Sequence, residues 1–390
     1  MYRFYLSIIT TFLFITSFAQ GKLDSLTQEL NKLQHNSHLT GFAAAIIDKD
    51  GIVYAQGFGH ANKEKNIPYT HQTVQPIASI SKTILAVALM KAQELGKLNL
   101  DDNINNHLPF KIVNPNHPEK TITIRHLANH TSGILDGDSY ERTYLFQTDI
   151  QPFYHKLSKE IRKDTKTLVE LYNMNEIMSL EEFIKKQYVQ GEIWYSDKHF
   201  SKKPPGRTYK YSNMGANIVA YIIEQAVEED YRNFVQKHIL NPLHMDNSGW
   251  RSEKYHPQNE ATLYWYGYPI PESDLVTYPD GSFMTNTVDY GKFLSTMIQG
   301  YNGMDNILSH SSYIEMMKQP DSSDLKKGIF WSVNNTKIGH SGSDLGIVSH
   351  AYFLKQNNIG IIVFVNTSDT IDAMLEVRNI YRTTLKYTKQ

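Results

Sequence analysis

A serine and a lysine three residues apart open an apolar helical stretch of this 390-residue chain. Ser79 and Lys82 stand in Ser-Ile-Ser-Lys, and the run Thr83–Leu95 follows, with Gly96 as its expected C-cap. Residues three apart share a helix face, so the Lys82 amine can approach the Ser79 hydroxyl. A helix N-terminus also directs backbone N–H groups at the serine, where an oxyanion would form. The pair predicts a nucleophilic serine with a basic neighbour.

This motif alone is a weak signal, because the chain contains a second copy. Ser323-Asp324-Leu325-Lys326 follows Pro320, is surrounded by charge and opens no apolar helix. We interpret this copy as a surface turn. For Ser79 considered by itself, a helix-capping serine is the better interpretation.

A second element supports the catalytic interpretation. Tyr211-Ser212-Asn213 follows the turn Pro204-Pro205-Gly206 and precedes an expected helix from about Met214. A tyrosine beside a lysine can have a lowered pKa and act as a base. Asn213 would hold the lysine and donate its amide to a substrate carbonyl. The alternative is a buried tyrosine followed by an N-capping asparagine.

The third element is His340-Ser341-Gly342-Ser343, just before the C-terminal strands. Gly342 allows close backbone approach, so an extended substrate can pair with this strand edge. The Ser343 N–H is the candidate second oxyanion donor, opposite that of Ser79. A glycine-rich turn with an incidental histidine is the alternative for this element alone.

The three motifs, in this order, resemble those of the serine β-lactamase and penicillin-binding protein superfamily. The nearest resemblance is to its class C-like branch of DD-carboxypeptidases, D-aminopeptidases and esterases, which carries Tyr-x-Asn and often His-x-Gly. It extends from about residue 38 to 386. Accessory stretches match too: Thr123-Ile124-Arg125-His126-Leu127, His130-Thr131-Ser132-Gly133, Asn241-Pro242-Leu243-His244-Met245 and Gly339-His340-Ser341-Gly342.

The resemblance implies an acyl-enzyme mechanism. Lys82 and Tyr211 take the Ser79 proton, Ser79 attacks a carbonyl, and Tyr211 protonates the leaving group. Asn213 joins them as a catalytic residue, and residues 340–343 bind the substrate and its oxyanion. The resemblance implies no metal and no organic cofactor. His130 and Ser132 look catalytic, but in the family that stretch is structural.

The resemblance leaves the substrate open among D-alanyl peptides, D-amino acid amides, β-lactams and esters. His340 replaces the lysine of true β-lactamases, so we expect substrate carboxylates to bind best when it is protonated. Peptidoglycan fragments are candidate partners; no stable protein partner is predicted. The competing hypothesis is a sensor or cell-wall binding protein that is acylated once without turnover.

Both ends of the chain carry the expected strands. Residues 42–48 and 52–58 form a hairpin pattern around Lys49-Asp50-Gly51, and residues 348–354 and 359–365 are apolar runs separated by a polar turn. Helical periodicity marks 24–35, 80–95, 150–174, 180–189, 214–228, 287–299 and 371–386. The simplest fold is α/β (α+β): one antiparallel sheet from both chain ends, flanked by helices, plus a mostly helical lobe.

The chain is expected to form one catalytic domain over 20–390. Its α/β lobe covers about 24–95 and 325–388, and its helical lobe about 96–324, with the active-site cleft between them. The segment 135–205 is charged and aromatic. Its Trp194, Tyr195 and Phe200 are interpreted as packing residues, with a substrate rim as the alternative.

Composition excludes several function classes. The net charge of -1 gives no nucleic-acid footprint. The absence of cysteine excludes disulfides, a cysteine nucleophile and thiolate metal sites. The 16 histidines include no His-Glu-x-x-His zinc pair, and no Gly-x-Ser-x-Gly elbow indicates an α/β-hydrolase.

The N-terminus predicts export. A positive start at Arg3 precedes an apolar run, and Ser17 and Ala19 place small residues before a cut at Gln20. This is the layout of a secretory signal peptide over 1–19. The expected location is therefore periplasmic or secreted, with an uncleaved anchor as the alternative.

Overall fold

The computed structural model describes residues 21–251, 257, 259–318, 328–368 and 371–388. The predicted signal peptide and the second Ser-x-x-Lys motif, at 323–326, lie outside these residues. None of the helices in the described part of the chain is long and apolar enough to cross a bilayer.

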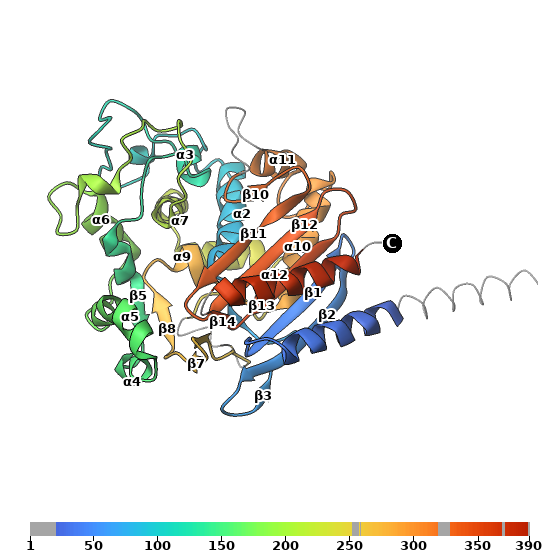
Figure 1. The fold of residues 1–390 in the computed structure, drawn as a ribbon. Helices are drawn as coiled ribbons and strands as arrows, with labels where there is room; N and C mark the ends of the chain where they lie inside the picture. The colour runs from blue at the N-terminus through green and yellow to red at the C-terminus, as the bar shows by residue number, and fades with distance from the viewer. Residues whose placement is uncertain (1–20, 252–256, 258, 319–327, 369–370, 389–390) are drawn as a thin grey trace, which may run out of the picture.

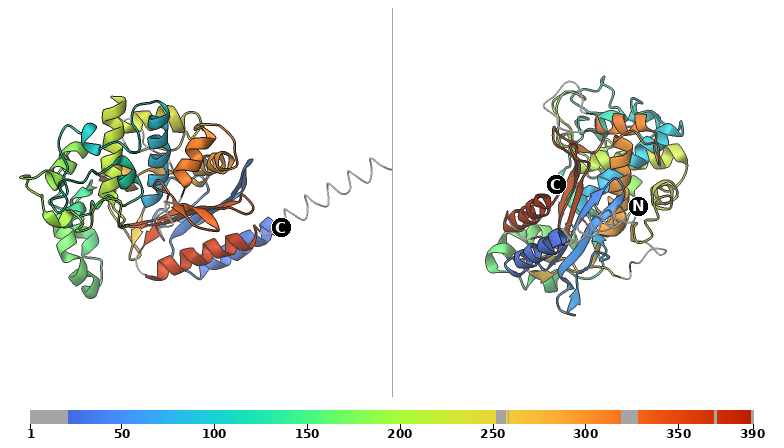
Figure 2. Two further views of the ribbon diagram at one scale, coloured as in Figure 1. Left: turned by 90° about the horizontal axis from the view of Figure 1, so that it is seen from above. Right: turned by 90° about the vertical axis from the view of Figure 1, so that its right-hand side faces the viewer.

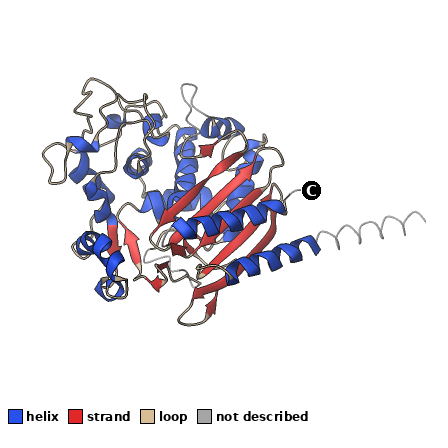
Figure 3. Cartoon of the chain, viewed as in Figure 1, coloured by secondary structure: helices blue, strands red, loops and turns tan. Residues whose placement is uncertain are grey.

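One antiparallel sheet of seven strands organises the described residues, in the order β10-β11-β12-β13-β1-β2-β3 (Figures 1 and 3). Strand β1, from the N-terminal part, pairs with β13, from the C-terminal part, with Phe42 opposite Val365. The sheet strands are β1 (Gly41–Asp48), β2 (Gly51–Asn62), β3 (Ile67–Pro68), β10 (Ser332–Val333), β11 (Lys337–Asp344), β12 (Ile347–Leu354) and β13 (Gly360–Val365). The predicted α/β fold, with a sheet made by both chain ends, is confirmed.

Alternate residues of the central strands bury both faces of this sheet. In β1, Phe42 and Ala44 pack with the helix of residues 21–35 and with α12 (Ile371–Lys386). The intervening Ala45 and Ile47 join the larger core with α2 (Ser81–Glu94) and α10 (Thr287–Tyr301). Figure 2 shows the two terminal helices side by side on one face of the sheet, with α2 and α10 on the opposite face. The apolar runs are therefore central strands buried on both faces.

The remaining helices and short strands surround this sheet. The α-helices are α3 (Ile124–Ala128), α4 (Gln151–Tyr154), α5 (Lys159–Tyr172), α6 (Leu180–Tyr188), α7 (Asn213–Val227), α8 (Tyr231–Val235), α9 (Tyr278–Gly281) and α11 (His310–Met317). The 3₁₀-helical turns are η1 (Ala78–Ile80), η2 (Ile104–Asn106), η3 (Asp138–Thr143) and η4 (Asp197–His199), and η5 (Gln236–Leu240) is a π-helical turn. The short strands are β4 (Gln75–Pro76), β5 (Tyr144–Phe146), β6 (Tyr264–Trp265), β7 (Tyr268–Pro269), β8 (Ser273–Leu275), β9 (Met284–Thr285) and β14 (Thr367–Ser368).

The prediction of one helix over residues 150–174 is wrong. The structure has two helices there, α4 and α5, separated at residues 155–158. Ser158 Oγ accepts a hydrogen bond from Ile161 N and caps a new helix. Capping satisfies a backbone N–H that a continuous helix would have paired internally. The apolar spacing continues across the break, so periodicity alone did not reveal it.

Helix α2 lies at the centre of the molecule and packs against α7 and α9. Because α2 carries Lys82 and α7 begins at Asn213, this packing brings the first two motifs together. Strand β11 contacts η1 and brings the third motif to the same place. The predicted division into lobes stays a prediction; α10, which it places in the helical lobe, packs against β1, β2 and β13.

Candidate active site

Ser79 and Lys82 meet where turn η1 runs into helix α2. Lys82 Nζ donates a hydrogen bond to Ser79 Oγ at 3.1 Å. Ser79 is partly exposed, whereas Lys82 is fully buried. A buried lysine is held in one position by its surroundings, while a partly exposed serine stays accessible to a substrate. The structure thus brings the two side chains together, as their spacing predicts.

Gly342 allows strand β11 to approach η1 closely. A Cβ atom at Gly342 would lie 2.4 Å from the Ile77 carbonyl oxygen and 2.9 Å from Ala78 Cβ. Ser349 Oγ of the adjacent β12 donates to the Ile77 carbonyl at 2.8 Å. Ala78, directly before Ser79, has φ +48°, a left-handed conformation that is strained for a residue with a Cβ. The backbone before Ser79 is therefore fixed by both strands.

The C-terminal half of β11 has one edge without a strand partner among the described residues. Strand β10 pairs only with Ile338 and Gly339, while β12 pairs with the whole of β11 on its other side. Ser341 and Ser343 are exposed on this half. An extended peptide can add to such an edge through its main chain. This is where the sequence predicts substrate binding.

His340 is buried within the same strand. Its Nδ1 lies 2.6 Å from the Ser341 carbonyl oxygen. Because a carbonyl can only accept, this contact assigns the proton to Nδ1. The His340 ring lies 6.3 Å from the Tyr211 ring, between centroids. The structure therefore places His340 beside Tyr211, with its Nδ1 engaged by the backbone.

Tyr211 and Asn213 are positioned by Asp136, which sequence reasoning missed. Its carboxylate accepts hydrogen bonds from Ser212 Oγ and from the backbone N–H groups of Asn213 and Met214, each at 2.9 Å. A carboxylate at a helix N-terminus satisfies donors that lack an intrahelical partner. In the sequence, Asp136-Gly137 resembles an ordinary turn, and nothing in this local pattern indicates that Asp136 caps the helix after Tyr211.

His130 supports Tyr211 from the other side. Its ring lies 4.4 Å from the Tyr211 ring, its Nδ1 accepts from Ser212 N at 3.3 Å, and its carbonyl accepts from Lys210 N at 2.8 Å. These bonds hold the backbone on both sides of Tyr211. The placement of His130 agrees with its interpretation as a structural residue. Ser132, also left out of the catalytic set, accepts from Ile134 N within its own turn.

Charge and burial compete at Lys82. Burial lowers the pKa of Lys82, but Tyr211 and Asp280 raise it, and the net shift is upward. Lys82 Nζ lies 5.3 Å from the centroid of the Tyr211 ring. The buried Tyr211 hydroxyl and Asn213 Oδ1 make no hydrogen bond of good geometry in the described residues. Buried polar atoms without a partner are uncommon in proteins, and a catalytic role is one explanation for them.

Asp280, from α9, is a further residue of the site that the sequence did not indicate. Its backbone carbonyl accepts from Lys82 Nζ at 2.7 Å, and its carboxylate Oδ1 lies 4.0 Å from the same nitrogen. Burial raises the pKa of Asp280, while the neighbouring Lys82 opposes that shift. In the sequence Tyr-Pro-Asp-Gly, this residue looks like a turn aspartate.

The aromatic residues of segment 135–205 are mainly packing residues. Phe183 packs edge-on against Trp194 at 5.7 Å, and Phe200 lies 5.7 Å from Tyr188 and 6.1 Å from Tyr195, between ring centroids. Phe200 is buried, although it also lines a hollow of about 500 Å³. These contacts favour the packing interpretation for the three aromatics.

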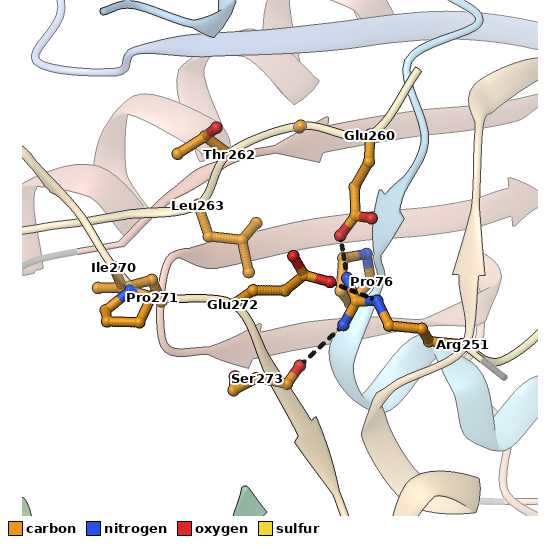
Figure 4. Close-up of a pocket in the computed structure, with 10 residues that line it drawn as sticks. Pro76, Arg251, Glu260, Thr262, Leu263, Ile270, Pro271, Glu272 and Ser273 are labelled. Atoms are coloured by element: carbon orange, nitrogen blue, oxygen red, sulfur yellow. Dashed lines mark hydrogen bonds and ion pairs between the residues drawn. The ribbon is translucent and has the colours of Figure 1, made fainter. Parts of the chain in front are cut away.

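A second charged cluster surrounds Arg251, in a hollow of about 230 Å³ (Figure 4). Arg251 forms ion pairs with Glu260, with Glu272 at 2.7 Å and with Asp274 at 3.0 Å. Its side chain is only 7% exposed. Burial raises the pKa of Glu260 to about 7, against the opposing effect of Arg251. This cluster ties β8 to the segment around residue 260.

The fold and the Ser-Lys pair together are those of serine hydrolases that react through an activated serine. The family model described as Beta-lactamase matches residues 23–381. The chain belongs to this family, within the serine β-lactamase and penicillin-binding protein superfamily that its motifs resemble.

Several known proteins are similar to this chain. Protein flp of Staphylococcus aureus (strain COL) is 24% identical over 94% of this chain and 67% of its own length. The human serine beta-lactamase-like protein LACTB, mitochondrial, is 26% identical over 73% of this chain and 59% of its own length.

Among solved structures, the octameric penicillin-binding protein homologue from Pyrococcus abyssi has a TM-score of 0.68 and 24% identity, covering 95% of this chain and 78% of its own. The penicillin binding protein from Bacillus halodurans has a TM-score of 0.66 and 21% identity, and the match covers 91% of this chain and 99% of its own. The structural likenesses support the fold.

Proposed function

We propose that this protein is an exported serine hydrolase that forms a covalent acyl-enzyme through Ser79. The observation that carries the proposal is the contact of fully buried Lys82 Nζ with Ser79 Oγ at 3.1 Å, beside Tyr211. A serine hydroxyl is a weak nucleophile unless a neighbouring group accepts its proton. Family membership supports the same chemistry.

In the proposed mechanism, the Lys82–Tyr211 pair takes the Ser79 proton as Oγ attacks the substrate carbonyl. The backbone N–H groups of Ser79 and Ser343 hold the oxyanion. Tyr211 then protonates the leaving group, and water releases the acyl group by the reverse proton path. Asn213, whose Oδ1 is buried without a partner in the described residues, is available to orient the substrate or the lysine.

The proposed substrates are D-alanyl peptides, β-lactams or simple esters. The strand edge at 340–344 supports an extended, peptide-like substrate, because it offers main-chain hydrogen bonds. Two of the similar structures carry names of penicillin-binding proteins, which supports the first two classes. Peptidoglycan fragments fit the same edge chemistry.

A substrate panel and an active-site label test this proposal. We expect a fluorophosphonate or penicillin probe to label Ser79, as mapped by peptide mass analysis, and Ser79→Ala to abolish both labelling and hydrolysis. Ser323→Ala, in the second Ser-x-x-Lys motif, is the matched control and should behave as wild type. Labelling at Ser323, or full activity in Ser79→Ala, would overturn the assignment.

The alternative is a sensor or cell-wall binding protein that is acylated but does not turn over. It predicts stoichiometric labelling of Ser79 without product release beyond one equivalent. The panel should therefore include D-Ala-D-Ala peptides, D-amino acid amides, β-lactams and short acyl esters, each followed over many turnovers. Sustained release from any of them favours the enzyme.

Export is the second part of the proposal. The sequence of residues 1–19 supports it through its basic start, apolar run and small residues before Gln20. Mass analysis of protein from the native host should find an N-terminus at or near Gln20. An intact Met1 on a membrane-bound form would show an uncleaved anchor instead.

A further inference from the structure

Asp280 contacts Lys82 through two separate groups, and sequence reasoning gave it no role. The backbone carbonyl of Asp280 accepts from Lys82 Nζ at 2.7 Å, shorter than the 3.1 Å contact of Nζ with Ser79 Oγ. The carboxylate oxygen Oδ1 lies 4.0 Å from Nζ, close enough for a strong charge interaction in a buried site. Both Lys82 and Asp280 are almost completely buried.

The Asp280 carboxylate is held in place through Oδ2, the oxygen that does not face Lys82. Its other oxygen, Oδ2, accepts hydrogen bonds from Asn217 Nδ2 at 2.5 Å and from Tyr140 OH at 2.9 Å. Asn217 also donates to the Asn213 carbonyl at 2.9 Å, which links Asp280 to the first turn of α7. Two donors on one oxygen favour the ionised carboxylate and leave Oδ1 for the lysine charge.

A charged lysine constrains the route of the serine proton. An ammonium group has three N–H donors and no lone pair, so it cannot accept a proton. If Nζ donates to Ser79 Oγ, the serine hydrogen must leave toward another acceptor. The Tyr211 phenol oxygen, buried and without a hydrogen bond of good geometry in the described residues, is the neighbouring candidate, and it takes the proton in its phenolate form.

We propose that Asp280 is a positioning residue that acts through Lys82. Its carbonyl fixes Nζ beside Ser79, and its carboxylate is the counter-ion that keeps the amine protonated, so that Tyr211 receives the serine proton. The proposal rests on the acyl-enzyme function proposed above. It assigns to Lys82 the role of a fixed positive charge and to Tyr211 the role of the base.

The other charged groups near Lys82 are already engaged. The Asp136 carboxylate caps α7, and Asp344 accepts from Tyr144 OH at 2.6 Å. Both act on Lys82 from farther away than Asp280, since neither makes a contact with its nitrogen. The imidazoles that adjoin Tyr211 belong to His130 and His340, which are bound to the backbone as described above. Asp280 is therefore the carboxylate best placed to control the charge of Lys82.

The test is the pH dependence of fluorophosphonate labelling at Ser79 in the full-length protein. Asp280→Asn removes the charge but keeps the backbone carbonyl and an oxygen that can accept from Asn217 and Tyr140. Without its counter-ion, Lys82 should lose its proton at lower pH. We expect the alkaline limb of the labelling rate to move down by about one pH unit or more, giving up to roughly tenfold slower labelling at alkaline pH values above the limb and a near-normal rate at about pH 7.

Two further variants make the result specific. Asp280→Ser, a smaller residue without charge, should show the same displaced limb, so the test does not depend on one variant folding well. Glu260→Gln, which changes a partly buried carboxylate of the Arg251 cluster, should keep the wild-type profile. An unchanged profile in both Asp280 variants, or an equal loss at every pH, would overturn the proposal. Failure of the function itself would differ, because Ser79 would then not be labelled in the wild type.

Discussion

Among the described residues, Lys82 and Arg251 are two cations with little solvent exposure and with carboxylates nearby, and their surroundings are built differently. Arg251 makes contact-distance ion pairs with three acidic residues, at 2.7 Å to Glu272 and 3.0 Å to Asp274. Lys82 instead contacts a hydroxyl and a carbonyl, while its nearest carboxylate oxygen, on Asp280, stays at 4.0 Å. In the first cluster the charges satisfy one another. In the second the lysine keeps its shortest contacts for the serine and for the backbone that positions it.

The side chains suit these two arrangements. A guanidinium offers five donors in a planar fork, so Arg251 can bind several carboxylates at once. An ammonium is a compact point charge on a flexible stem, so Lys82 can place a single positive charge beside Ser79. The comparison predicts that damage at Lys82 appears in the reaction rate, whereas damage at Arg251 appears in stability.

The largest expected effect is at Lys82 and Tyr211. Lys82→Ala and Tyr211→Phe should each lower kcat by roughly a thousandfold or more, because Tyr211 takes the serine proton and Lys82 supplies the positive charge beside it. If the two residues act as one unit, the double variant should be little worse than either single one. Steady-state kinetics on the best substrate of the panel measures this. Losses that multiply would show separate roles.

The second expected effect is at Arg251. Arg251→Met keeps the length of the side chain but leaves three carboxylates without their cation. We expect the free energy of unfolding to fall by about 2–4 kcal/mol, less than for a fully buried pair because the acidic partners are partly exposed. Denaturant unfolding measures this loss, and the Ser79 labelling rate of the folded fraction should be unchanged. A large fall in that rate with normal stability would mean that the two clusters are coupled.

The contrast also shows how far the sequence could lead. The predicted sheet and most helices are confirmed, because their signals are periodic and local, as in β1, where alternate residues face two cores. The break between α4 and α5 was missed, because the apolar spacing continues across Ser158, which caps the second helix.

At the site, Ser79 and Lys82 were recognisable because both belong to one helical turn. Asp136 and Asp280 were not, because they reach their partners across 77 and 198 residues of chain. Each stands in a stretch that resembles an ordinary turn. Only the packing of α7 and α9 on α2 gives them a place in the site.

A smaller effect is expected at Glu260. Its pKa is raised to about 7 in the folded protein, from an ordinary value of 4.5, chiefly by burial. A carboxyl with a raised folded pKa contributes stability that is complete below about pH 4.5 and is lost as the pH rises through about 7. We expect the wild type to lose about 1–2 kcal/mol over this range, after allowance for the partial exposure of Glu260.

Glu260→Gln should flatten that part of the stability profile. The measurement is the free energy of unfolding at several pH values, with Glu119→Gln, at an exposed position, as the control. A variant that keeps the wild-type slope would assign the pH dependence to another group. The Ser79 labelling profile should not change, which again separates the two clusters.

The smallest expected effect concerns His340 and the charge of the substrate. Relatives with a lysine in this motif offer a permanent positive charge to a substrate carboxylate, whereas a histidine offers one only when protonated, with an ordinary pKa of about 6.5. Its Nδ1–H donates to the Ser341 carbonyl, and its ring lies beside that of Tyr211. We expect KM for a peptide with a free carboxylate to rise a few-fold as the pH climbs through the histidine pKa, with kcat less affected because the lost contact is ground-state binding. The matched neutral ester should show no such rise, and His340→Lys should flatten the profile of the acid. If acid and ester have the same profile, His340 is a neutral hydrogen-bonding neighbour of Tyr211 and does not bind the substrate carboxylate through its charge.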